Sequence, residues 1–478
     1  MKILLFLIIP NICFSFFKSK PGKNYLVTLT CFWFKCLAGI KNYSQLCDKV
    51  AHIYISTKAL ITMTDKKNIL LLSVWTMILM CCYSCRENGI KPISGDNYYV
   101  CAYVWPSCHD DSLGHKYLWP QGEGEWEVIK QGNPRFPGHY QPKQPLWGYG
   151  HDDDPKVVEK WIDTALKYGV NTFVYDWYWF MDYPYLEGAL DDGFLGAKNN
   201  EKMNFYIMWA NHEVKKNYWN YHLYGDDTSL LFDPKVNMDQ FKTIVARVIK
   251  QYFNKKNYVK IDGCPVFGIF DMDQFVQSFG TIDEAAKAME YFRAEVKKAG
   301  FKGLHIQQNN GGGSFLAEDF IIAQQERIDK LGINSHAFYN MGGFTPDYLT
   351  YGANAIQIRE QWAKAFNIPV FPTVSIGWDD TPRFPAKGEN DITRFNQTPR
   401  AFESFLEVAK KYVDEHPQQP PFIMINAWNE WVEGSYLLPD RYFGFGYLEA
   451  VQHVFRQEEY IRGLGSLIRL PGGLTCLG

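Results

Sequence analysis

The sequence predicts a (β/α)₈ barrel, in which eight parallel strands alternate with helices. After residue 98, short apolar runs alternate with amphipathic helical patterns about eight times, which is typical of a parallel sheet. The chain from Cys85 to Gly478 has the length of one decorated barrel. Polar and aromatic residues follow several of the strands directly, and the strand ends of a barrel share one mouth. No G-x-G-x-x-G follows the first strand, which disfavours a doubly wound dinucleotide-binding sheet.

The beginning of the chain differs from the rest. Residues 1–62 are rich in Phe, Cys, Lys and Ile and show neither a helical nor a strand period, so we predict an over-extended start outside the fold. Met63 opens a second beginning, with Lys66 and Lys67 before the apolar run of residues 69–80. A basic start and an apolar core of about a dozen residues are typical of a secretory signal.

Ser84-Cys85 resembles a bacterial lipoprotein cleavage site, which implies a lipid on Cys85. We therefore expect a signal over residues 63–85, a linker over 86–97 and a secreted protein, either periplasmic or on the cell surface. The alternative is that residues 1–17, also basic and then apolar, form the signal. The apolar run at 69–80 is too short for a membrane span, so the membrane is expected as a partner only through the lipid.

Composition narrows the class of partner. The formal net charge of −3 gives no reason to expect nucleic acid as a partner. Aromatic residues make up 17% of the chain, and such rings suit both sugar-binding clefts and the core of a large barrel. The spacing of Cys101, Cys108, Cys264 and Cys476 fits neither a zinc site nor a disulfide framework, so we expect buried free thiols or at most one bridge, such as Cys101 with Cys108. We expect no metal and no cofactor.

Eight strands are predicted in chain order. They cover residues 98–105, 170–175, 204–209, 258–270, 304–308, 333–338, 370–376 and 422–425, the fourth beginning as a hairpin that turns at Asp262-Gly263. Helices are predicted from the N-cap Asp154 to Gly169, over 236–252, over 282–299 and from Thr398 onward. Residues 107–151 are predicted to form a long functional loop that carries Glu125, Trp126 and His139.

The end of the eighth strand carries the strongest chemical signal. The run Phe422-Ile-Met-Ile-Asn-Ala-Trp-Asn-Glu-Trp-Val-Glu-Gly434 changes from apolar to polar and aromatic. Glu430 and Glu433 would face opposite sides of a continuing strand, but both can face one pocket where the strand breaks into a turn. Cleavage of a glycosidic bond needs two carboxyl groups, one protonated and one charged. We predict Glu430 and Glu433 as catalytic; the alternative is a loop-capping Glu beside a solvated one.

Other strand ends supply candidates for substrate binding. Asp176 and its neighbours can form subsite walls, although each such residue taken alone is as readily loop scaffolding. The histidines of the long loop lack the spacing of metal ligands. The predicted substrate-binding residues are Tyr103, His139, Trp177, Trp179, Trp209, Asn211, Trp378, Asp379, Asp380, Arg383, Trp428 and Asn429.

Several of these motifs together resemble one family. They are Tyr103, Glu125-Trp126, Gly138-His139, Trp209-Ala-Asn211, Gly377-Trp-Asp-Asp-Thr-Pro-Arg383 and Asn426-Ala-Trp-Asn-Glu-Trp-Val-Glu-Gly434. The resemblance is to the glycoside hydrolase family 99-like proteins, also described as WbsX-type glycosyltransferase-like, and covers roughly residues 98 to 455.

The resemblance implies specific roles for the two acids. In characterised endo-α-mannosidase and endo-α-mannanase members the motif reads Glu-Trp-His-Glu-Gly. The first Glu assists attack by the sugar's own 2-hydroxyl through an anhydro-sugar, and the second is the general acid and then the base, with retention overall. Glu430 takes the first role here and Glu433 the second, while Val432 replaces the His and weakens the transfer of mannan specificity.

The expected function is therefore a retaining glycoside hydrolase acting on a polysaccharide or glycan, α-mannoside-like in the family's pattern. Two alternatives stay open. A WbsX-type glycosyltransferase would use an activated sugar, but a secretory signal separates the protein from nucleotide sugars. A non-catalytic surface lipoprotein that binds glycans would keep the tryptophans without needing both carboxyl groups.

Overall fold

The computed structural model describes residues 98–311, 313–385 and 387–456. The predictions of an over-extended start at 1–62, a signal at 63–85, a lipid on Cys85 and a linker at 86–97 lie outside the described residues and stay predictions. Cys101, Cys108 and Cys264 are free thiols, so the expected alternative of a Cys101–Cys108 bridge is not formed. Within the described ranges, none of the helices combines the length and the apolar character needed to cross a bilayer.

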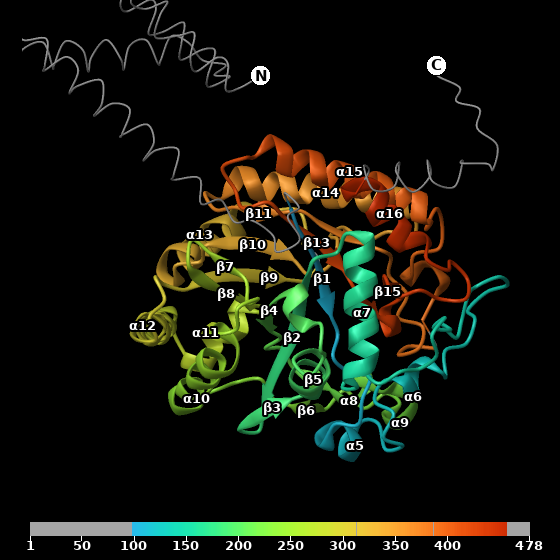
Figure 1. Cartoon of the computed structure of the whole chain (residues 1–478), viewed down its shortest axis with the longest axis horizontal. Coiled ribbons are helices and arrows are strands. Elements are labelled where there is room, and N and C mark those ends of the chain that lie inside the picture. Colours follow the sequence, from blue (N-terminus) through green and yellow to red (C-terminus); the bar gives the residue numbers. More distant parts are fainter. Residues whose placement is uncertain (1–97, 312, 386, 457–478) are drawn as a thin grey trace, which may run out of the picture. The chain divides into compact units, whose positions relative to one another are not determined.

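The described chain forms a closed (β/α)₈ barrel, so the predicted fold class is confirmed (Figure 1). Neighbouring strands pair in parallel all the way round, and β11 and β12 are two parts of one strand on either side of Pro372. Since β11 pairs with β10 and β12 with β13, this divided strand closes the sheet. In order around the barrel, the strands are β1 (Tyr99–Val104), β2 (Thr172–Phe180), β4 (Asn204–Trp209), β8 (Cys264–Ile269), β9 (His305–Asn310), β10 (Ser335–Phe338), β11 (Val370–Phe371), β12 (Thr373–Ser375) and β13 (Phe422–Asn426).

Helices surround this sheet (Figure 1). The predicted ends of α7 are confirmed, because the Asp154 side chain accepts a hydrogen bond from the Lys156 amide and Gly169 ends the helix at φ 101°. Thr398 caps α15 in the same way. The main helices are α7 (Pro155–Tyr168), α10 (Met238–Val248), α11 (Met272–Phe279), α12 (Ile282–Lys298), α13 (Glu318–Leu331), α14 (Tyr348–Ala365), α15 (Pro399–Glu415) and α16 (Gly446–Phe455).

Some elements differ from the predictions. The loop at 107–151 contains two short helices, α5 (Ser112–Tyr117) and α6 (Trp126–Ile129), and is therefore not free of secondary structure. The second strand runs five residues beyond its predicted end at Tyr175, because its polar and aromatic end continues as a hairpin with β3 (Tyr183–Tyr185). Four of the main helices were not predicted, namely α11, α13, α14 and α16.

The predicted hairpin before the fourth strand is present. β7 (Lys260–Ile261) pairs antiparallel with β8, and the two residues between them, Asp262 and Gly263, have φ of 53° and 80°. Positive φ at both central residues suits the right-handed twist of a two-residue hairpin, and Asp-Gly accepts it at low cost. This local geometry followed from the dipeptide alone.

Candidate active site

The strand-eight motif leaves the barrel in a tight antiparallel loop. β13 ends at Asn426, and β14 (Asn429–Glu430) then pairs with β15 (Ser435–Tyr436) around one 3₁₀ turn, Trp431–Glu433. Gly434 closes the loop at φ 65°, a left-handed conformation that glycine adopts without strain. The chain therefore does break into a turn between the two predicted catalytic residues.

Glu430 and Glu433 converge on one guanidinium. Arg383 Nη1 donates to Glu433 Oε1 at 3.0 Å, and Arg383 Nη2 lies 3.9 Å from Glu430 Oε1. Both carboxyl groups are nearly buried, with Glu430 2% and Glu433 6% exposed. The two acids therefore face the same point at the carboxyl ends of the strands, with Glu433 held there in an ion pair.

A third carboxylate binds the other side of Arg383. Glu125 Oε1 accepts from Arg383 Nε at 3.2 Å and from Nη2 at 3.0 Å. Its Oε2 accepts from Trp105 Nε1 at 2.5 Å and from Ser107 Oγ at 2.9 Å, and Glu125 is fully buried. Glu125, Arg383, Glu430 and Glu433 are called the Arg383 cluster below. One cation therefore faces three carboxyl groups.

A fourth carboxyl group reaches the cluster through a tyrosine. The hydroxyl of Tyr339 lies 2.5 Å from Glu430 Oε2 and 2.9 Å from Asp176 Oδ2. A hydroxyl has one proton, so Tyr339 donates to only one of the two, and the other contact is a hydrogen bond only when that carboxyl group carries a proton. The arrangement suits a chain in which protonated Asp176 donates to Tyr339 and Tyr339 donates to ionised Glu430.

Burial raises the pKa of the carboxyl groups in this site. The pKa of Glu430 lies well above its ordinary value because of burial and the nearby charge of Glu433. Burial also raises the pKa of Asp176 strongly and that of Glu433 to about 7, in the last case against the lowering effect of Arg383. Like charges in a dry site cannot all ionise, so the group holds protons near neutral pH, as an acid–base site requires.

Aromatic rings cover the cluster. The Tyr218 ring lies 5.2 Å from Arg383 Cζ and packs on Phe384 at 5.4 Å, while Tyr218 itself is 39% exposed. It belongs to the short helix α8 (Lys216–Trp219), which α9 (Tyr221–Tyr224) follows. His222 Nε2 hydrogen-bonds to the carbonyl oxygen of Pro382 at 2.7 Å. These contacts hold the α8–α9 segment over Arg383.

Four predicted tryptophans do not reach the cluster. Trp177 Nε1 donates to Glu187 at 2.8 Å, and Trp179 lies beside Trp177 at 5.9 Å between ring centroids. Trp209 packs on Phe241 and Phe275, which belong to α10 and α11. Trp428 packs on Trp161 of α7 at 6.3 Å. Side chains alternate along β2, so Trp177 and Trp179 lie on the opposite face of this strand from Asp176 and Tyr178.

Asp379 and Asp380 bind protein groups at the end of strand seven. Asp379 Oδ2 accepts from Gln141 at 2.7 Å and lies 3.0 Å from His139 Nε2 and 3.1 Å from Lys143 Nζ. Lys143 and His139 keep the pKa of Asp379 below its usual range although burial opposes them. Asp380 pairs with Arg135 at 3.1 Å and with Lys387 at 2.6 Å. These contacts fasten the 107–151 segment to the strand-seven end, so Asp379, Asp380 and His139 shape the site.

The remaining predicted residues support the strand ends. The Asn429 side chain hydrogen-bonds to both backbone groups of Trp105, accepting from the amide at 2.8 Å and donating to the carbonyl at 2.7 Å. The Asn211 side chain binds Asp271 in the same way, accepting from its amide at 2.9 Å and donating to its carbonyl at 2.7 Å. Tyr103 lies inside the barrel, where its ring packs on Tyr339 at 4.7 Å and its hydroxyl accepts from Asn309 at 2.9 Å. Trp378 is half-buried, and its amide donates to Thr393 at 2.9 Å.

Three residues of the site were absent from the predicted catalytic and substrate-binding residues, although Asp176 was named as a possible subsite wall and Glu125 as part of the long functional loop. Tyr339 directly follows the sixth strand and Asp176 directly follows the predicted second strand, so the strand-end rule that found Glu430 applied to both. Glu125 was named as part of the long loop and of the family motif, but no role was predicted for it. Its sequence gives no sign of a buried ion pair, because its partner Arg383 lies 258 residues away.

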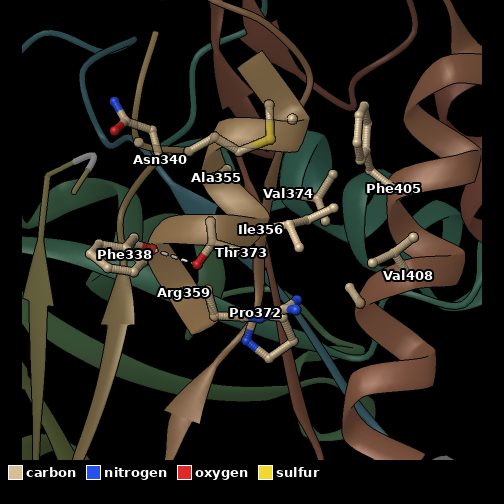
Figure 2. Close-up of a pocket in the computed structure, with 14 residues that line it drawn as sticks. Phe338, Asn340, Ala355, Ile356, Arg359, Pro372, Thr373, Val374, Phe405 and Val408 are labelled. Atoms are coloured by element: carbon tan, nitrogen blue, oxygen red, sulfur yellow. Dashed lines mark hydrogen bonds between the residues drawn. The ribbon is translucent and has the colours of Figure 1, made fainter. Parts of the chain in front are cut away.

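A crevice between α14, α15 and β12 is a separate feature (Figure 2). It holds about 20 Å³, which is space for about one water molecule. Phe338, Ile356, Phe405 and Val408 are among its walls, and Thr373 Oγ1 donates to the Phe338 carbonyl at 2.8 Å beside it. It is too small for a sugar and lacks the carboxyl groups of the Arg383 cluster.

The family described as glycosyltransferase WbsX matches residues 100–451. This chain belongs to the WbsX glycosyltransferase family. The match includes every residue of the Arg383 cluster, and it confirms the WbsX-type resemblance drawn from the motifs.

Two curated relatives are similar in sequence. Both are described as uncharacterized protein WxcX, from Xanthomonas campestris pv. campestris strains ATCC 33913 and B100. They are 24% and 23% identical to this chain over 349 residues, which are 70% of this chain and 46% of each relative. The chain thus spans about half the length of these relatives.

Two solved structures are similar to this chain at low identity. Both are a glycoside hydrolase family 99 endo-α-mannosidase from Bacteroides thetaiotaomicron, one of them in complex with bis-tris propane. The complex has a TM-score of 0.47 at 14% identity and covers 77% of this chain and 99% of that one. The other has a TM-score of 0.46 at 15% identity and covers 76% and 98%.

Proposed function

We propose that this WbsX-family protein hydrolyses O-glycosidic bonds of a polysaccharide or glycan with retention of configuration. The observation that carries the proposal is the convergence of Glu430 and Glu433 on Arg383 at the strand ends, with the pKa of both acids raised. Two carboxyl groups that share protons near neutral pH are the functional groups of glycosidic cleavage.

The first step forms an anhydro-sugar. Glu430 takes the proton of the sugar 2-hydroxyl while that oxygen bonds to the anomeric carbon. The glycosidic bond breaks, and Glu433 gives its proton to the leaving oxygen. In the second step Glu433 takes a proton from water and the water oxygen bonds to the anomeric carbon. The bond between the 2-oxygen and the anomeric carbon breaks, and Glu430 returns its proton to the 2-oxygen. The two inversions give retention, and the cycle ends with Glu433 protonated and Glu430 ionised, as it began.

The neighbours support these roles. Tyr339 donates to Glu430 when Asp176 holds a proton, which stabilises the ionised base that the first step needs. Arg383 positions Glu433, and burial raises the pKa of that acid to about 7. The raised pKa values support a shared proton but favour neither acid as its holder. The assignment of the acid role to Glu433 therefore follows the family motif.

The substrate is proposed more narrowly from the same motif. An α-mannoside-like glycan is the family's pattern, and Val432 occupies the position of its His. Val432 is fully buried in this structure, so it contacts the protein interior. The walls that select the sugar then come from neighbouring segments such as α8–α9.

Transfer of an activated sugar is the second candidate, favoured by the description of the family as glycosyltransferase WbsX. The same two carboxyl groups would then act on a nucleotide or lipid diphosphate donor. Such a donor needs cations at its phosphates, whereas the described cluster offers one arginine that is already bound by carboxylates. This charge balance favours hydrolysis.

The test is a screen of the purified full chain. It is incubated with α-mannans and a panel of other polysaccharides, and new reducing ends and the anomer first released are followed by NMR. Glu433→Gln should lower turnover at least about a hundredfold on a substrate with a poor leaving group, with folding intact. Substrates that lack a free 2-hydroxyl should not be cleaved. Transfer from a nucleotide sugar without any hydrolysis would contradict the proposal.

We also propose that the protein acts outside the cytoplasm, anchored by a lipid on Cys85. The support is the basic and then apolar run at 63–80 followed by Ser84-Cys85. The mass of the N-terminal peptide of the native protein tests this location. A native chain that starts upstream of Met63 without a lipid would contradict it.

A further inference from the structure

A cavity lined by tryptophans lies beside the Arg383 cluster. It holds about 240 Å³, many times the space that one water molecule needs. It lies between the start of α7, the helix α6, the 145–150 segment and the turn after β14. Its lining includes four indoles, from Trp126, Trp147, Trp161 and Trp431.

The cavity is on the other side of the chain from the catalytic carboxyl groups. Trp126 directly follows Glu125, and Trp431 directly follows Glu430. In both pairs the carboxyl group lies at the Arg383 cluster and the indole lines the cavity. The two rings lie 5.8 Å apart. The cavity is therefore a separate site, built on the same two segments as the cluster.

Hydrogen bonds and ring contacts fix the indoles that form the walls of the cavity. Trp126 Nε1 donates to the Gly150 carbonyl at 3.0 Å, and the Trp431 ring stacks on Tyr436 at 3.8 Å. Trp431 Nε1 is a buried donor that has no acceptor among the residues that the structure describes. Such a donor costs free energy unless water or a bound group accepts from it. Trp147, which is half-buried, is the most accessible of the four indoles.

The charged residues that line the cavity are both lysines. Lys160 Nζ lies 3.8 Å from the Trp147 ring centroid, and Lys156 is one turn away on α7. In the described part of the chain, neither has a carboxylate within ion-pair distance. Burial lowers the pKa of Lys160, an effect that a bound anion would oppose. The site thus combines flat apolar walls with unpaired positive charge.

We propose that this cavity binds one residue of an acidic saccharide. The apolar face of the sugar ring packs on the indoles, and its carboxylate binds Lys156 and Lys160. Neutral sugars share the ring contact but not the ion pair, so a uronic acid binds more tightly. A glycan held here also lies next to the segments that carry Glu125 and Glu430.

Titration of the full chain with glucuronate and with glucose tests the proposal. Quenching of tryptophan fluorescence and calorimetry are the readouts. Glucuronate is expected to bind at least about tenfold more tightly than glucose at low salt. Lys160→Gln combined with Lys156→Gln should remove this preference, and Trp147→Ala should weaken both sugars. Trp147 is half-buried, so that variant is expected to fold, which a thermal melt verifies.

Two controls separate the cavity from the catalytic site. Lys130→Gln removes a lysine that lies over the Tyr149 ring at 4.8 Å, outside the cavity, and should leave glucuronate binding unchanged. Glu433→Gln should also leave it unchanged, so binding stands whether or not the protein proves to be a hydrolase. Binding that survives the lysine and Trp147 variants, or equal affinity for the two sugars, would overturn the proposal, as would no binding of glucuronate at millimolar concentration.

Discussion

Arg383 donates to Glu433 across 3.0 Å, and both side chains are less than a tenth exposed. The same guanidinium binds Glu125, which is fully buried. Charges in such a place cannot be compensated by water, so each depends on its protein partners. Arg383 thus links the first loop, the seventh strand end and the eighth strand end, and its role is both structural and electrostatic.

Replacing Arg383 by Ala should lower the free energy of unfolding by about 3–5 kcal/mol, because it leaves buried carboxylates without their cation. Urea denaturation followed by circular dichroism measures this. Arg394→Ala is the matched control, since Arg394 pairs with Glu389 at a partly exposed site and should cost at most about 1 kcal/mol. An Arg383→Ala variant no less stable than this control would show that the cluster does not depend on the arginine.

The pH dependence of activity should report Glu433. Its pKa is raised to about 7, and a general acid works only while protonated, so kcat/KM should fall as pH rises through about 7. The same shift acts on stability. A carboxyl group whose pKa is higher in the folded state favours folding at low pH, and this contribution is lost between its ordinary value of 4.5 and about 7. Glu433→Gln should remove both effects, and an unchanged stability profile in that variant would contradict the shift.

Tyr339→Phe should impair the base without unfolding the protein. It removes the hydroxyl that lies between Asp176 and Glu430, and turnover should fall at least about tenfold while the pH profile shifts, because the loss of a hydrogen bond to a charged group costs about 1.5–3 kcal/mol. Tyr103→Phe is the control, since Tyr103 packs on Tyr339 but its hydroxyl bonds to Asn309 and to the Phe338 carbonyl. Equal effects of the two variants on the pH profile would exclude a role for the Tyr339 hydroxyl between Asp176 and Glu430.

Gly434→Ala should destabilise more than Gly444→Ala. Both glycines have positive φ, 65° and 58°, so both variants pay about 1–2 kcal/mol for a left-handed alanine. A Cβ at position 434 would also lie 2.7 Å from Asp379 Cβ, whereas one at 444 meets nothing within 4 Å. The extra overpacking should cost about 1–3 kcal/mol. Thermal melts of the two variants, with turnover of each, measure the difference.

The strand order of the barrel could be predicted from the sequence, because alternating apolar runs and helices in a parallel sheet leave few topologies. The break of the chain between Glu430 and Glu433 followed from Gly434, which allows the turn. The hairpin at Asp262-Gly263 and the ends of α7 followed from residues with strong local preferences. The unpredicted helix α13 lacks such a signal, since its N-cap is Ala317, whose side chain makes no capping bond.

The sequence did not predict in the same way which side chains of a strand face the site and which face the helices. Strand two reads Tyr-Asp-Trp-Tyr-Trp, and its alternation separates Asp176 from Trp177 but does not say which of the two faces the site. Strands of a barrel are buried on both faces, so apolar and aromatic residues occur on both. The tryptophans were therefore predicted at the site, whereas Trp177 donates to Glu187 and both Trp209 and Trp428 pack on aromatic residues of helices.

The sequence by itself determined the barrel class, the family and the two acids at the end of the last strand, because these depend on local pattern and on neighbours in the chain. Only the tertiary structure decided that Arg383 joins Glu125 to Glu433 and that Tyr339 joins Asp176 to Glu430. Such partners lie far apart in the chain, and only the closure of the barrel brings their strand ends to one mouth.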